Sequence, residues 1–118
     1  MKNTENTLQK GSIYLSHFPF TNLSQSKIRP IVVLAEDSNY NDVIVLAVSS
    51  IVDRWDKSAV VYISSQQPHF PETGLKKDSF VLLNRIATIQ KNRLFKKLGQ
   101  LPSALDQEML SGPRPSLL

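Results

Sequence analysis

The chain has 118 residues, of which 41% are hydrophobic and 20% are charged. This length suits a single core, and this composition is typical of a folded domain rather than a disordered chain. The absence of cysteine excludes a disulfide framework, a thiol nucleophile and zinc ligation by thiolates. The formal net charge of +4 is compatible with a nucleic-acid partner but does not by itself indicate one.

The beginning of the chain is polar and carries no targeting signal that we recognise. Its first ten residues, MKNTENTLQK, lack the apolar core of a signal peptide, and the longest apolar runs are too short to span a bilayer. We therefore expect a cytoplasmic protein without membrane contact. We also expect a flexible segment over residues 1–9, one domain over residues 10–111 and a loose tail over residues 112–118.

Short apolar runs between polar turns predict six strands. These runs cover residues 12–18, 31–35, 43–48, 59–63, 80–83 and 85–89. The runs 31–35 and 43–48 lack polar alternation, which indicates strands buried on both faces. The polar or proline-containing stretches 21–28, 36–42 and 64–79 predict loops and turns.

The C-terminal part gives a mixed signal. Residues 94–101 carry leucines at helical spacing, whereas Gly99 disfavours a helix there. Residues 103–106 form a capping box for a short helix, which Gly112 and Pro113 would end. Several short strands and one late helix predict a mostly β fold, a small antiparallel β-barrel with a short C-terminal helix. Functional residues should then lie on its loops and strand ends.

Standard catalytic and metal-binding motifs are absent from the sequence. There is no HExxH, no glycine-rich phosphate loop and no GxSxG elbow. His17 and His69 have no metal-site spacing, and the acidic residues are scattered through turns. We therefore expect no metal ion and no cofactor.

Two strand ends carry residues suited to phosphate chemistry. Pro30 favours an extended backbone at Arg29, whose planar guanidinium matches phosphate oxygens. Ser49 and Ser50 close the strand at residues 43–48, where a hydroxyl can donate to a phosphate oxygen or satisfy the backbone. A solvated arginine and a backbone-capping serine fit these patterns equally well, so the residues alone leave the choice open.

Seven short blocks, in this order and spacing, resemble the MazF/PemK toxins. They are GSIY at 11–14, FPFT at 18–21, KIRPIVVL at 27–34, VIVLAVSS at 43–50, GLKKDSFVLL at 74–83, IATI at 86–89 and LGQL at 98–101. The resemblance extends over nearly the whole predicted domain, and it depends on the series of blocks rather than on any one of them.

The resemblance implies an SH3-like barrel, a homodimer and a toxin with a cognate antitoxin as partner. It implies a metal-independent endoribonuclease that cleaves single-stranded RNA at short sequences. The family's catalytic arginine falls on Arg29 and its catalytic threonine on Ser49, with Ser50 as the alternative. Ser12 stands where the family often has an aspartate, Ser49 lacks the methyl group of threonine, and the final helix is shorter than usual.

Metal-free RNA cleavage uses the substrate's own 2′-OH as nucleophile and leaves a 2′,3′-cyclic phosphate and a 5′-OH. Arg29 would stabilise the charge that develops on the phosphorane oxygens, and Ser49 would donate to one of them or position Arg29. The proton carriers stay open, because arginine is a poor general base. His17 is a candidate because imidazole titrates near neutral pH, but it shares its strand face with apolar residues and equally fits the edge of the core.

Five further residues are candidates for RNA contact. They are Lys27, Trp55, Lys76, Lys77 and Arg85. The basic residues also fit a solvated charged face, and the tryptophan also fits a core position. Two alternatives need no catalytic pair, namely a protein-binding toxin of the gyrase-poison type and a degenerate module that binds only antitoxin or RNA.

Overall fold

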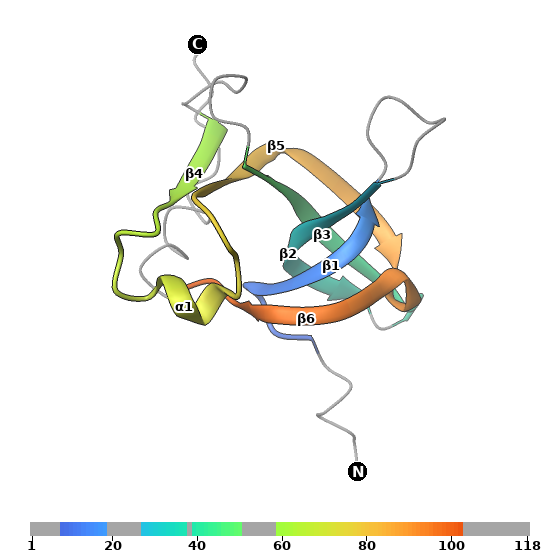
Figure 1. Ribbon diagram of the computed structural model, residues 1–118. Helices are drawn as coiled ribbons and strands as arrows, with labels where there is room; N and C mark the ends of the chain where they lie inside the picture. The colour runs from blue at the N-terminus through green and yellow to red at the C-terminus, as the bar shows by residue number, and fades with distance from the viewer. Residues whose placement is uncertain (1–7, 19–26, 38, 51–58, 103–118) are drawn as a thin grey trace.

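The computed structural model describes residues 8–18, 27–37, 39–50 and 59–102, which form one curved antiparallel sheet (Figure 1). Its strands are β1 (Ser12–Phe18), β2 (Lys27–Asp37), β3 (Asp42–Ser49), β4 (Val60–Ile63), β5 (Ser79–Gln90) and β6 (Leu94–Gln100). The strand order is β4-β5-β3-β2-β1-β6. A one-turn helix, α1 (Phe70–Thr73), follows β4, and a 3-10 turn (Lys91–Arg93) joins β5 to β6. In this part of the chain, no helix has the length and apolar character needed to cross a bilayer.

The prediction of a mostly β, antiparallel fold is confirmed. The sheet curls strongly, and its hydrogen-bonded order is open, with β4 and β6 at the two ends. The ambiguous residues 94–101 form β6 and its exit, not a helix. The predicted C-terminal helix lies outside the described residues, as do most of the segments expected to be loose at the two termini.

Several boundary predictions were wrong for identifiable reasons. Strand β2 begins inside the expected loop 21–28 and ends inside the expected turn 36–42, because pairing with β1 and β3 extends it beyond its apolar run. The runs 80–83 and 85–89 belong to one long strand, β5, because the extra residues are absorbed in a bulge. Leu46 pairs with Ile86 while the next residue, Ala47, pairs with Leu82, so residues 83–85 bulge out opposite that single step. The expected loop at 64–79 contains α1, whose four residues are too few to show helical periodicity.

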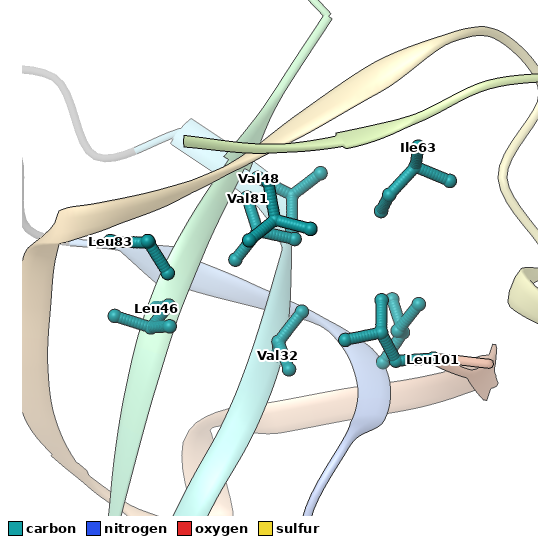
Figure 2. Packing of buried hydrophobic residues seen from close by; sticks show 9 residues of the cluster. Val32, Leu46, Val48, Ile63, Val81, Leu83 and Leu101 are labelled. Carbon is teal, nitrogen blue, oxygen red and sulfur yellow. The ribbon is translucent and has the colours of Figure 1, made fainter. Parts of the chain in front are cut away.

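Strands β2 and β3 are buried on both faces along most of their apolar runs, at residues 31–33 and 45–48. Successive residues Ile31, Val32 and Val33 are each 0% exposed, and they alternate between two apolar clusters. The first cluster lies in the space that the curved sheet encloses (Figure 2). It comprises Ile13, Val32, Leu46, Val48, Val61, Ile63, Val81, Leu83 and Leu101. The second cluster, on the other face, comprises Ile31, Val33, Val43, Val45, Ala47, Phe80, Leu82 and Ile89.

Helix α1 packs directly against the backbone of β6. A Cβ atom at Gly99 would lie 2.1 Å from the carbonyl oxygen of Glu72, and one at Gly74 would lie 2.1 Å from the carbonyl oxygen of Leu98. Gly74 also has a positive φ of 72°, which ends the helix in the left-handed conformation. Both glycines are therefore needed for the two backbones to approach.

We predict that Gly99→Ala lowers the free energy of unfolding by roughly 1–3 kcal/mol, because the added methyl group forces α1 and β6 apart. Urea denaturation followed by circular dichroism measures this change. Lys97→Ala, an exposed position in the same strand, serves as the control and should change little. Equal stability of Gly99→Ala and the parent protein would show that this contact is not as tight as the geometry requires.

A mostly buried ion pair ties the N-terminal side of the domain to the turn after β5. Glu36 pairs through Oε2 with the ammonium group of Lys91, while its Oε1 accepts a 2.7 Å hydrogen bond from the backbone N–H of Leu8. The Lys91 hydrogen bond, followed by that from Leu8, lowers the pKa of Glu36 below its ordinary value of 4.5. Because this pKa is lower in the folded state, the pair stabilises the fold above pH 4.5, and the stabilisation is lost as pH falls through the folded-state pKa.

We predict that Glu36→Gln lowers the free energy of unfolding by about 1 kcal/mol at neutral pH, because it removes a charge-assisted contact. The difference from the parent protein should shrink as pH is lowered from 4.5 through the folded-state pKa, below which Glu36 is protonated in both states. Urea titrations between pH 3 and pH 7 measure the difference, with exposed Glu72→Gln as the control. A difference that stays constant over this range would contradict the assignment.

Candidate active site

The hydrogen-bonded ladder between β2 and β3 ends two residues before two polar residues that the sequence singles out. It runs from Asp37–Asp42 to Ile31–Ala47. Beyond this last pair, Arg29 is paired with β1 and Ser49 with β5. Figure 1 shows the first part of β2 beside the end of β1, whereas the end of β3 runs along β5 toward β4. Arg29 and Ser49 thus flank the point at which the two central strands part.

Both residues lie on the same face of the sheet. Arg29 and Ser49 are each two positions from the last pair, Ile31–Ala47, and residues two positions apart on a strand share a face. Ile31 and Ala47 belong to the second cluster, and so does Phe80, which is paired with Ser49. The guanidinium and the hydroxyl therefore emerge at the edge of the second cluster.

The two side chains differ in burial. Ser49 is 3% exposed, whereas Arg29 is partly exposed, with its Nε atom buried. Ser50 is exposed and lies one residue beyond the end of β3. A guanidinium at the edge of an apolar cluster acts in a lower dielectric than bulk water, which strengthens its interaction with an anion. The arrangement suits an oxyanion that approaches Arg29 from solvent.

Ser16 is a further residue at this site, and only its place in the alternation of β1 marks it in the sequence. It is paired with Arg29 across β1 and β2 and is 0% exposed. Its hydroxyl donates toward the carbonyl oxygens of His17 (3.0 Å) and Arg93 (3.1 Å). These bonds fix β1 to the turn before β6 and give the strand that carries Arg29 a rigid neighbour.

His17 does not join Arg29 and Ser49. It is paired with Ile28, so it lies on the opposite face of the sheet from Ser16 and Arg29. Its ring contacts Phe95 edge to face, with 5.1 Å between ring centroids. Of the two interpretations that the sequence left open for His17, this placement agrees with the one at the edge of the core.

The other candidates are spread along the chain. Lys76 and Lys77 are exposed and immediately precede Asp78 and β5, and Arg85 is exposed in the β5 bulge. Lys27 is paired with Phe18 at the start of β2. Trp55 lies outside the described residues. Within the ranges described above, no three His, Asp or Glu side chains are grouped as a metal site requires.

Comparison with known proteins gives concordant results. Residues 9–112 match the family described as PemK-like, MazF-like toxin of type II toxin-antitoxin system. The chain is 30% identical over 96 residues to the endoribonuclease MazF of Staphylococcus saprophyticus, an alignment that covers 80% of this chain and 78% of the relative.

Solved structures with low sequence identity share the fold. Mycobacterium tuberculosis toxin MazF-mt6 superposes with a TM-score of 0.64 at 17% identity, covering 85% of this chain and 89% of the toxin. A mycobacterial endoribonuclease in complex with its cognate antitoxin superposes with a TM-score of 0.64 at 16% identity, covering 92% of this chain and 100% of that one.

Proposed function

Since the chain belongs to the PemK-like, MazF-like toxin family and is an endoribonuclease toxin with a cognate antitoxin, we propose that Arg29 and Ser49 carry out its cleavage of single-stranded RNA. The observation that carries the proposal is their position on one face of the sheet, on either side of the point where β2 and β3 part. Neither a protein-binding toxin of the gyrase-poison type nor a degenerate binding module requires this pair. The named activity of the staphylococcal relative also favours the nuclease.

The proposed reaction is an intramolecular displacement at phosphorus. The 2′-oxygen forms a bond to the adjacent phosphorus as its proton leaves, and the bond to the 5′-oxygen breaks as that oxygen takes up a proton. The products are a 2′,3′-cyclic phosphate and a 5′-OH. Arg29 donates two hydrogen bonds to non-bridging oxygens, whose charge grows in the transition state. Ser49 donates a third or holds Arg29 in position.

The proposal assigns no protein side chain as general base. His17 lies on the opposite face of the sheet, and arginine is a poor base. Catalysis then depends on charge stabilisation and on holding the 2′-oxygen in line with the leaving oxygen. Among the other candidates, Lys76, Lys77 and Arg85 are exposed, which supports contacts with the RNA backbone.

The proposal also covers the domain bounds, the oligomeric state and the cellular location of the protein. We propose one domain over residues 10–111, acting in the cytoplasm as a homodimer, without membrane contact and without a cofactor. The family match over residues 9–112 supports the domain, and the exposed apolar side chains of Ile28, Ile86 and Phe95 offer area for a subunit contact.

We predict that Arg29→Ala lowers kcat/KM for a single-stranded oligoribonucleotide about 100- to 1000-fold without unfolding the protein, because it removes the group that faces the developing charge. Arg29→Lys should recover only part of the rate, since the fork geometry is lost. Ser49→Ala should cause a smaller loss and Ser49→Thr almost none. Gel assays and circular dichroism measure rate and folding.

Ser50→Ala is the matched control for the serine variants. A folded Arg29→Ala protein that cleaves at the parent rate would exclude Arg29 from the active site. If Ser50→Ala causes the loss that Ser49→Ala does not, the hydroxyl has been assigned to the wrong serine.

We predict that cleavage persists in excess EDTA and that each cut leaves a 2′,3′-cyclic phosphate on the upstream fragment and a 5′-OH on the downstream fragment. A guanidinium and serine hydroxyls do not form the oxygen-rich anionic shell that a divalent cation requires. Treating the products with a kinase that labels only 5′-OH ends, followed by sequencing of these ends, tests the chemistry and reveals the cleavage sequence. Activity that chelation abolishes and Mg²⁺ or Mn²⁺ restores would contradict this mechanism.

A further inference from the structure

An exposed aromatic ring on β4 is held in a fixed orientation at both of its ends. Tyr62 is 45% exposed, and its hydroxyl donates a 2.8 Å hydrogen bond to Oδ2 of Asp78. The other carboxylate oxygen of Asp78 accepts a 2.7 Å bond from the backbone N–H of Ser65. The ring itself packs on Phe80, with 5.1 Å between centroids and a tilt of 34°. Few rotamers of an exposed tyrosine satisfy both contacts, so little conformational entropy remains to be lost on binding.

The ring lies in the same cross-strand row as Ser49. Tyr62 is paired with Phe80, and Phe80 is paired with Ser49, so all three share a face of the sheet. Two interstrand spacings place the backbone of Tyr62 about 10 Å from that of Ser49. This distance is a short step along an extended nucleotide chain that passes over Ser49.

The surroundings of Tyr62 carry charge suited to a polynucleotide. Lys76 and Lys77, both exposed, immediately precede Asp78. Hydrogen bonds from Ser65, then that from Tyr62, hold the pKa of Asp78 below its ordinary value, so its carboxylate stays ionised as an acceptor for the tyrosine hydroxyl. Two exposed lysines thus come immediately before the residue that holds the ring, and exposed ammonium groups in this segment suit contacts with the phosphates of a stacked nucleotide.

We propose that Tyr62 is a base-stacking residue that receives one nucleotide of the single-stranded RNA held at Arg29 and Ser49, with Lys76 and Lys77 contacting its phosphates. This inference rests on the proposed function of that site. Every base offers an aromatic face, so the ring contributes affinity and sets the register of the strand relative to the cleaved bond. Asp78 acts as a positioning residue through its bond to the tyrosine hydroxyl.

The test compares variants by cleavage kinetics and by the affinity for a fully 2′-O-methylated RNA of the same sequence, which cannot be cleaved. We expect Tyr62→Ala to raise Kd for this RNA, and KM for the cleavable one, roughly tenfold or more, with kcat changed much less. Tyr62→Trp keeps a stacking face and should bind nearly as tightly as the parent. Tyr40→Ala is the matched control, because Tyr40 is 74% exposed at the turn between β2 and β3, at the other end of β3 from Ser49.

Several outcomes would overturn the proposal. If the parent protein cleaves RNA and Tyr62→Ala has an unchanged Kd and KM, the ring binds no base, while the proposed active site stands. If Tyr62→Ala alters only the mass of the assembly in light scattering, or only the inhibition by the antitoxin, the ring belongs to a protein contact. If the parent protein cleaves no RNA, the proposed function fails and this inference fails with it. Should Tyr62→Ala not fold, Tyr62→Ser and Tyr62→Trp are compared instead. A Kd about tenfold higher for Tyr62→Ser than for Tyr62→Trp supports the proposal, and equal Kd values overturn it.

Discussion

The arrangement of the domain depends on two central strands that must bury both of their faces. Because Ile31, Val32 and Val33 have no exposed surface, β2 can lie only between two apolar layers, and β3 beside it obeys the same constraint. At one end, the pairing of the two strands stops with Ile31 and Ala47, next to the end of their apolar runs. Where these runs end, at Arg29 and Ser49, the strands part and each keeps its outer neighbour. The proposed active site is thus located at the boundary of the core, where polar side chains can reach solvent without unpairing the centre of the sheet.

Much of the sheet could be predicted from the sequence because burial on two faces leaves a plain compositional signal. The run at residues 31–35 is the clearest case. The continuity of β5 could not be predicted, since a bulge interrupts the apolar pattern and its position depends on pairing with Leu46 and Ala47. Helix α1 was missed because four residues carry no periodicity. The strand β6 is explained by its pairing with β1, a contact between distant segments, and Gly99 is explained by the close approach of α1.

In the candidate site too, residues marked by local sequence could be predicted, whereas residues brought in by pairing between strands could not. Strand ends, an Arg-Pro step and a family resemblance were sufficient to single out Arg29 and Ser49. Ser16 and Tyr62 could not be added from the sequence, because each joins the site only through cross-strand register. For His17, the sequence left a catalytic role and a place at the edge of the core both open, and pairing with Ile28 places it on the face away from Arg29.

The central claim is that Arg29 and Ser49 act on the same phosphate as a unit. A double-mutant cycle on kcat/KM for one defined oligoribonucleotide tests it most directly, using Arg29→Ala, Ser49→Ala and the combined variant. The account predicts strong non-additivity, in which the double variant is hardly slower than Arg29→Ala alone, because the hydroxyl can assist the transition state only while the guanidinium holds the phosphate. Independent effects, in which the fold losses of the two single variants multiply in the double variant, would contradict it.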